Sequence, residues 1–317
     1  MKHNKTMDTL RRWILPIIIV ALGIVFAVMS PTFLKSTNLM NILNQTAIMS
    51  IMAIGATFVI VAGEMDLSFS SIASISAVLC LTFAIKGYNA IASWAVVLVI
   101  GLVIGVFNAI IVVKLRIPSM LGTIGSQILV GGIVAWIANG GTVWTSKFST
   151  LFAVPGRAVI FGFIPFPVAI LAVIFVICLI VLDKTVLGRY FYAVGGNAKA
   201  ADHAGINANN IKAMSFVILG LLAALAGIVI ASKFASATSN VGSGYLFPAI
   251  IAVYLGSIFL KDGVPNMWGT IVACLFLQEL SNGFSLIGLK YWHENVTQGV
   301  VMLLAIAMQM AGKRSKK

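Results

Sequence analysis

Apolar segments long enough to span a lipid bilayer recur along the whole of this 317-residue chain. A helix needs roughly 20 mainly apolar residues to cross the hydrocarbon core, and segments of that kind recur about ten times. Because a spanning segment must satisfy its own backbone hydrogen bonds, the pattern predicts an all-α, polytopic membrane protein with about ten transmembrane helices. We expect these spans at residues 13–30, 46–63, 67–86, 90–113, 118–138, 163–182, 212–232, 246–260, 266–286 and 295–311.

The composition agrees with a protein whose main solvent is lipid. Hydrophobic residues make up 60% of the chain and charged residues only 9%, against roughly a quarter charged in an ordinary soluble domain. The formal net charge is +13, but the basic residues flank apolar segments and form no stripe with interleaved aromatic side chains. This placement indicates contact with anionic membrane lipid and argues against a nucleic-acid partner.

The N-terminus resembles a secretory signal peptide, since basic residues at 2–12 precede the first apolar segment. That segment is long enough to span a bilayer and no A-x-A cleavage site follows it, so we expect a retained first span. With both termini in the cytoplasm, most of the 21 basic residues fall on the inner side, as the positive-inside rule favours. We expect residues 1–317 to form a single transmembrane domain with one long cytoplasmic loop at 183–211.

The sequence offers no pattern for covalent chemistry. It contains no HExxH or GxSxG motif and no GxxxxGK[ST] loop that would cradle nucleotide phosphates. The cysteines Cys80, Cys178 and Cys274 lie far apart inside apolar segments, without the spacing of a metal site or a disulfide framework. We therefore expect no catalytic residues, metal or cofactor in this chain, and buried cysteines that act as small hydrophobic residues.

Active transport through such a chain needs energy from an ion gradient or from a partner. Ion coupling usually leaves ionisable side chains within the spans, because charge at that depth is costly. Glu279 is the clear candidate here. A single carboxylate is thin support for an ion-coupled secondary transporter, so an ATPase partner that docks on the cytoplasmic side is the more attractive alternative.

The cytoplasmic loop contains a compact helix signal in the sequence GRYFYAVGGNAKAADHAGIN, which starts at Gly188. Asn197 is a good N-cap, residues 198–204 are mostly helix formers, and Gly205 can end the helix in a left-handed turn. A helix of this length is too short to be stable alone in water, so it must pack on something.

Three consecutive aromatic residues, Tyr190, Phe191 and Tyr192, precede this helix. They can anchor the loop at the lipid interface, or fill a groove on a partner as hot-spot residues do. A capped surface helix beside a simple aromatic belt explains the same residues without any partner.

The motifs of this chain resemble those of a known family. The loop from Gly188 is similar to the pattern G-R-x-x-x-A-x-G-x-N-x-x-A-A-x-x-x-G-I, and GEMDLSFSS at 63–71 is similar to G-G-x-D-L-S-x-G-S. Near the C-terminus, NGFSLIGL at 282–289 is similar to N-G-L-x-L-x-G. These patterns belong to the permease subunits of bacterial ABC importers of the ribose, xylose, galactose and autoinducer-2 type. The resemblance runs over nearly the whole chain.

The resemblance implies a function and a set of partners. It implies a permease subunit in the bacterial inner membrane that imports a sugar or sugar-like small polar solute. ABC ATPase subunits would use ATP, a periplasmic or lipid-anchored binding protein would deliver the solute, and a second permease copy or paralogue would complete the pathway. In the family a short cytoplasmic coupling helix inserts into the ATPase. The matching residues here are Gly188, Arg189, Gly195, Gly196, Asn197, Ala200, Ala201, Gly205 and Ile206.

Six polar residues are candidates for the translocation pathway, each with a structural alternative. Asp66 and Ser68 can instead cap the third span, and Glu64 can pair with a basic residue such as Lys114. The others can instead form hydrogen bonds between helices, as such side chains commonly do in membranes. These others are Gln278, Glu279 and Asn282.

Two further patterns concern the arrangement of the spans. Short acidic breaks at 63–68 and 261–265 separate neighbouring apolar segments in the two halves of the chain. Such pairs occur in repeat-built transporters and suggest an inverted internal repeat. Gly101 and Gly105 form a GxxxG pair, which predicts close packing of the fourth span against another helix.

Overall fold

The computed structural model describes residues 5–146, 148–260 and 263–314. Its long helices are α1 (Lys5–Met29), α2 (Ser36–Val61), α3 (Phe69–Ile85), α4 (Ala90–Ala109), α5 (Ser119–Ile137), α7 (Phe166–Leu179), α10 (Ala208–Phe234), α11 (Ser243–Leu260), α12 (Met267–Leu286) and α13 (Tyr291–Arg314). Shorter helices are α6 (Thr150–Arg157), α8 (Val186–Gly196) and α9 (Ala198–His203). Single π-helical turns, η1 (Ile110–Lys114) and η2 (Ile180–Lys184), continue α4 and α7.

Extended structure among the described residues is confined to two small antiparallel pairs. β1 (Thr142–Trp144) pairs with β4 (Ser236–Thr238), and β2 (Val159–Ile160) pairs with β3 (Ile164–Pro165). The predicted all-α class therefore holds for the membrane part, while the 139–162 loop contains α6 and short strands.

The apolar segments predicted from the sequence coincide with the long helices, although some boundaries differ. α2 begins at Ser36, well before the expected start at residue 46. The residues before 46 include polar side chains, which is why the sequence predicts a later start. They are part of the helix, and two of them form hydrogen bonds with other helices. Asn38 exchanges hydrogen bonds with Asn282, and Gln45 accepts one from the Tyr245 hydroxyl at 3.1 Å.

Five helices among the described residues are long and apolar enough to cross a membrane by length and composition. They are α2, α4 with η1, α5, α7 with η2, and α10. Shorter apolar helices lie at Trp13–Met29, Phe69–Ile85 and Ser243–Ile258. The chain is therefore a multi-pass, all-α membrane protein, and its full count of spans stays an expectation.

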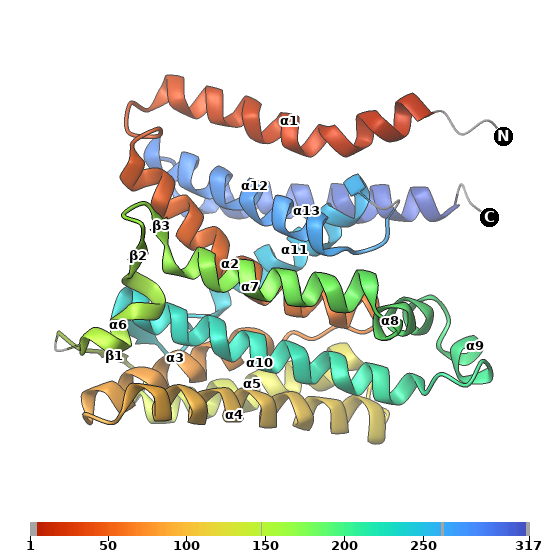
Figure 1. The fold of residues 1–317 in the computed structure, drawn as a ribbon, viewed down its shortest axis with the longest axis horizontal. Helices are drawn as coiled ribbons and strands as arrows, with labels where there is room; N and C mark the ends of the chain where they lie inside the picture. The colour runs from red at the N-terminus through yellow and green to blue at the C-terminus, as the bar shows by residue number, and fades with distance from the viewer. Residues whose placement is uncertain (1–4, 147, 261–262, 315–317) are drawn as a thin grey trace.

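The helices lie side by side, and the short elements gather at their two ends (Figure 1). α8 and α9 lie at the same end as the start of α1 and the end of α13, which we call the α9 end. α6 and strands β1 to β3 lie at the opposite end. The sequence predicts that both termini and the 183–211 loop lie on the same side of the membrane. The start of α1, the end of α13 and this loop do lie at one end of the molecule.

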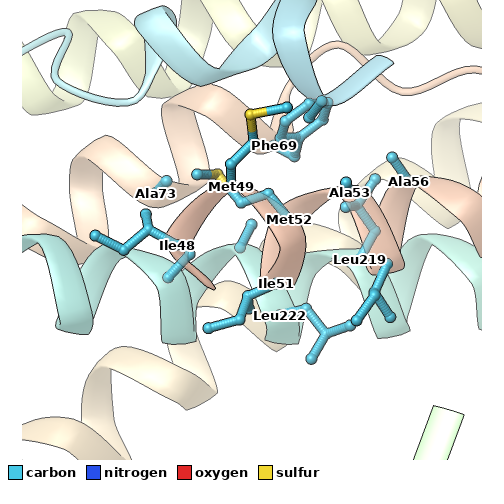
Figure 2. Packing of buried hydrophobic residues seen from close by; sticks show 14 of the residues in the cluster. Ile48, Met49, Ile51, Met52, Ala53, Ala56, Phe69, Ala73, Leu219 and Leu222 are labelled. Atoms are coloured by element: carbon cyan, nitrogen blue, oxygen red, sulfur yellow. The ribbon is translucent and has the colours of Figure 1, made fainter. Parts of the chain in front are cut away.

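The centre of the molecule is formed by α2 and α10. In the most apolar 18-residue stretch of each helix, 83% is buried for α2 and 67% for α10, against 22% for α7 with η2. Figure 2 shows α2 between its neighbours, with Ile51 beside Leu222 of α10 on one side and Met49 and Met52 beside Phe69 of α3 on the other. The peripheral helices instead expose apolar side chains, as expected where lipid covers them.

The predicted close packing at Gly101 and Gly105 occurs between α4 and α10. A Cβ atom built on Gly101 would lie 2.6 Å from the Gly220 carbonyl oxygen, and one on Gly105 would lie 2.7 Å from the Phe216 carbonyl oxygen. The helices therefore touch backbone to backbone, which requires small residues on both sides.

Candidate functional site: the 183–211 loop and the polar positions around it

The first part of the loop turns sharply from η2 into α8. The Thr185 hydroxyl accepts a hydrogen bond from the Gly188 backbone nitrogen at 3.3 Å and so caps α8. A Cβ atom on Gly188 would overlap the Leu182 carbonyl oxygen. Gly188 is therefore required by the turn itself, while the next residue, Arg189, is exposed.

The short helix predicted after Asn197 is present as α9, and both of its predicted ends are confirmed. The Asn197 side chain accepts a hydrogen bond from the Ala200 nitrogen at 3.1 Å. At the other end Gly205 has a φ of +82°, and the Ile206 nitrogen donates to the Ala201 carbonyl oxygen at 3.0 Å. This is the usual way in which a glycine in the left-handed region satisfies the last carbonyls of a helix.

α9 is hydrogen-bonded to the start of α10. The Asp202 carboxylate accepts a hydrogen bond from the Ala208 nitrogen at 2.9 Å, and Asn207 caps α10 through the Asn210 nitrogen at 3.0 Å. Ala201 is buried against the rest of the loop, at 5% exposure. The remaining face of the helix is open to solvent and is formed by Lys199, Ala200, Asp202 and His203.

The aromatic residues before α9 serve mainly to hold α8 in place. Phe191 is fully buried and packs edge-on against Phe58 of α2, with ring centroids 5.2 Å apart. Burial, with a further contribution from Asp183, raises the pKa of the Tyr192 hydroxyl, which donates a hydrogen bond to the Pro265 carbonyl oxygen at 3.1 Å. Only Tyr190 is exposed. Neither a lipid anchor nor a partner groove accounts for Phe191.

The sequence carries a signal for this arrangement. Leu187, Phe191 and Val194 recur at the spacing of one helical face, which predicts an amphipathic helix with its apolar side turned inward. Phe191 and Val194 are buried, and Leu187 is partly buried.

The adjacent glycines Gly195 and Gly196 differ in their surroundings. A Cβ atom on Gly195 would overlap the carbonyl oxygen of Val61, the last residue of α2. Nothing lies within 4 Å of a Cβ atom built on Gly196. Gly195 is therefore a packing residue, and Gly196 faces open space beside α9.

Glu64 forms an ion pair, but not with the expected residue. Its carboxylate lies 2.6 Å from the Nζ atom of Lys212 in the second turn of α10. The exposed fractions of the two side chains are 14% and 25%, so the pair is largely shielded from solvent. The predicted pairing of Glu64 with a basic residue is therefore confirmed, although the lysine belongs to α10 and is not Lys114 at the end of η1, the example that the sequence suggested.

Asp66 and Ser68 lie in a buried network between α2 and α3. The Asp66 carboxylate accepts hydrogen bonds from the Ser68 nitrogen at 2.6 Å, the Ser68 hydroxyl at 2.7 Å and the Asn108 side chain at 3.2 Å. Burial raises the pKa of Asp66 to about 6 in spite of these donors. The Ser68 side chain makes no capping hydrogen bond, and the Asp66 carboxylate instead accepts from the Ser68 backbone nitrogen, directly before α3. This geometry favours the capping alternative for Asp66 and contradicts it for Ser68, whose hydroxyl bonds to Asp66 and Asn108 instead. A role in transport stays a prediction for both residues.

The polar residues of α12 lie elsewhere and contact other helices. Asn282 and Asn38 exchange two side-chain hydrogen bonds of 2.9 Å, and Gln278 donates to the Met49 sulfur at 3.0 Å. Glu279 is buried at 7% exposure, with its Oε1 atom 2.9 Å from the position of a Cβ atom on Gly23 in α1. For Asn282 and Gln278 these contacts favour hydrogen bonding between helices, and a part in the pathway stays a prediction for all three residues.

Within residues 5–146, 148–260 and 263–314, no group of three or more histidine, cysteine or acidic side chains is placed to hold a metal ion. All three cysteines are free and buried, as expected.

Known proteins resemble this chain over most of its length. A family model described as the permease component of the branched-chain amino acid transport system matches residues 38–306. The ribose import permease protein of Escherichia coli is 36% identical over 293 residues, which cover 91% of this chain and 91% of that protein. No solved structure matches the chain.

Two further relatives come from other bacteria. The ribose import permease protein of Bacillus subtilis is 33% identical over 287 residues, or 90% of this chain and 89% of that protein. The autoinducer 2 import system permease protein of an Enterobacter species is 32% identical over 286 residues, or 90% of this chain and 82% of that protein.

Proposed function

This chain belongs to the family of branched-chain amino acid transport system permease components, and we propose that it is the permease subunit of an ATP-driven importer of a sugar or sugar-like small polar molecule. The relatives named as ribose and autoinducer 2 import permeases support the substrate class. Membership of the family favours ATP coupling over the ion-coupled alternative.

The observation that carries the coupling role is the exposed short helix α9. It has six residues and exposes most of them, yet Asn197 caps its start and Asp202 ties it to α10. A helix of this length does not form alone in water. The chain thus stabilises an exposed rigid helix at one end of the molecule, which is the geometry that a docking element requires.

The partners follow from this proposal. ABC ATPase subunits bind the α9 end and hydrolyse ATP, a periplasmic or lipid-anchored binding protein delivers the solute at the opposite end, and a second permease copy or a paralogue completes the assembly. The chain itself supplies no covalent chemistry.

We propose the topology on the same basis. About ten helices cross the bacterial inner membrane: five of the described helices have the length and apolar character that spans require, and three shorter apolar helices add to them. The other two expected spans coincide with α12 and α13. Both termini and the α9 end lie in the cytoplasm, in agreement with the positive-inside rule. The inverted repeat, suggested by the helix pairs α2–α3 and α11–α12, remains a hypothesis.

The proposed movement passes through α10. ATP-driven closure of the ATPase subunits displaces α9, and the hydrogen bond between Asp202 and Ala208 makes α10 follow. α10 lies at the centre of the helix packing. Close-packed interiors are poorly compressible and transmit such displacements.

Gly196→Trp tests the coupling role. The added side chain enters open space beside α9, so the permease should fold and insert normally while the bulk disturbs docking. We expect ATP hydrolysis by the reconstituted complex to lose its link to solute uptake, with the ratio of uptake to hydrolysis falling about tenfold or more, equivalent to at least ~1.4 kcal/mol of coupling. The two rates are measured in proteoliposomes that contain all subunits.

Gly299→Trp is the matched control, because Gly299 in α13 also has nothing within 4 Å of a built Cβ atom. It should leave the ratio unchanged. Ala201 is a poorer test site than Gly196, since it is buried and a larger side chain there would disturb the loop itself. Normal coupling in Gly196→Trp would count against the docking of α9.

A further inference from the structure

The segment that joins α2 to α3, residues 62–68, contacts four other elements through its backbone and side chains. We call it the α2–α3 connection. Gly63, with a φ of +82°, turns the chain out of α2, and the following five residues lead into α3. Its partners come from α8, α10, α4 and α5. Of these, α8 lies in the loop at 183–211, which we call the coupling loop, and α10 begins at its end.

On one side the α2–α3 connection is held by the coupling loop. The backbone of Gly195 in α8 packs directly on Val61 and Gly63, with no room for a Cβ atom. Glu64 pairs with Lys212 in α10, just beyond the point where Asp202 ties α9 to α10. A displacement of α8 or of the start of α10 therefore acts directly on this segment.

On the other side the α2–α3 connection is bonded to α5. The Met65 nitrogen donates to the Ser119 hydroxyl at 3.2 Å, and the Leu67 nitrogen donates to the Thr123 hydroxyl at 3.1 Å. Ser119 and Thr123 are one turn apart at the start of α5. Between these two sides, Asn108 of α4 bonds to both Asp66 and Ser68, at 3.2 and 2.7 Å.

We propose that the α2–α3 connection transmits movement of the coupling loop to α5. Its Gly195 and Lys212 contacts receive the displacement, and its hydrogen bonds to Ser119 and Thr123 pass it on. Among the long helices that bond to the α2–α3 connection, α5 has the smallest buried share of its most apolar stretch, 28% against 33% for α4 and 67% for α10, so it is the one best suited to move. The proposal rests on the proposed function, since the ATPase supplies the displacement.

The double variant Ser119→Ala/Thr123→Val tests the proposal. It removes both acceptors for the α2–α3 connection on α5 and leaves Gly195 and the Glu64–Lys212 pair intact. The readout is the distance between spin labels at Leu121→Cys in α5 and Trp13→Cys in α1, both exposed positions. The native cysteines are buried and do not compete for the label. The distance is compared in the complete complex without nucleotide and after vanadate trapping.

With the unmodified connection we expect the label distance to shift on trapping. In the double variant the shift should disappear while ATP hydrolysis continues. The matched control is Thr82→Val/Ser93→Ala, whose hydroxyls bond to carbonyl oxygens of their own helical turns, Val78 and Asn89. This control should keep the shift.

A charge exchange gives a second, independent test if the first variant does not fold. Glu64→Lys and Lys212→Glu should each abolish the shift, and the combined exchange should restore it because the ion pair is rebuilt. A shift that survives in Ser119→Ala/Thr123→Val, or that is absent from the unmodified complex, overturns the proposal. Failure of the ATPase subunit to co-purify with the permease instead contradicts the proposed function.

Discussion

Asn38 and Asn282 satisfy each other across the interface between the start of α2 and the end of α12. Each amide donates to the other, with both distances at 2.9 Å, although the residues are 244 positions apart. Polar contacts of this kind contribute on average about 0.6 kcal/mol in membrane proteins, and more in model peptides. The pair therefore fastens these helices without requiring a role in solute binding.

A double-mutant cycle tests this account of Asn282. Asn38→Leu and Asn282→Leu should each lower the free energy of unfolding, because each leaves a half-buried amide without its partner. The combined variant should lose less than the sum, with a coupling energy of about 1 kcal/mol. The free energies are measured by denaturant unfolding in micelles. Additive losses would contradict the exchange of hydrogen bonds.

At this scale the sequence predicts local contacts well and distant ones poorly. Asn197 and Gly205 were identified as the ends of α9 because a cap depends on residues within one helical turn. The partners of Glu64 and Asn282 could not be identified in this way. Lys212 and Asn38 lie far from them in the sequence and come close only when separate helices pack together. Gly195 could not be distinguished from Gly196 by sequence, since the difference lies in the carbonyl oxygen of Val61.

Among the elements, the crossing of α4 and α10 depends on glycine on both sides. A Cβ atom on Gly220 would lie 3.0 Å from the Gly105 Cα atom and would overlap the Gly101 carbonyl oxygen. The GxxxG spacing predicts that α4 has a narrow face, but it does not say which helix lies on that face. Only the folded structure identifies α10 as the neighbour.

Gly220→Ala measures the tightness of this crossing. The added methyl group would force the two backbones apart, and overpacking of this kind destabilises by about 1–3 kcal/mol. Gly131→Ala in α5 is the control, because nothing lies within 4 Å of its built Cβ atom. Thermal unfolding in detergent should show a loss for Gly220→Ala alone. Equal behaviour of the two variants would contradict backbone contact between α4 and α10.

α8 shows a second limit of sequence reasoning at the element scale. Its three aromatic residues are consecutive, which suggested a single exposed belt, but in a helix consecutive residues point about 100° apart. Phe191 is buried, Tyr192 is partly buried and Tyr190 is exposed as a consequence. The periodicity of Leu187 and Val194 around Phe191 is the feature that carries the information.

For the whole molecule, the apolar segments predicted the class of fold because the length of a spanning helix is set by the bilayer. They did not predict that α2 and α10 would be central or that α5 would be peripheral, since all three are apolar. The three helices differ in burial: 83% of the most apolar stretch of α2 is buried, 67% of that of α10 and 28% of that of α5. Polar residues that meet between helices, such as Gln45 and Tyr245, reveal the neighbours only in the folded chain.

The central claim is that α9 contacts an ATPase, and photo-crosslinking in the intact assembly tests it most directly. A photoreactive residue in place of Lys199 or His203, both exposed on α9, should capture the ATPase subunit in high yield. The same residue in place of Phe161, which is 84% exposed between β2 and β3, should not. These two strands lie at the end of the molecule opposite α9 (Figure 1). Capture of the ATPase from α9 alone is the predicted result. No capture from Lys199 or His203, or equal capture from Phe161, would contradict the account.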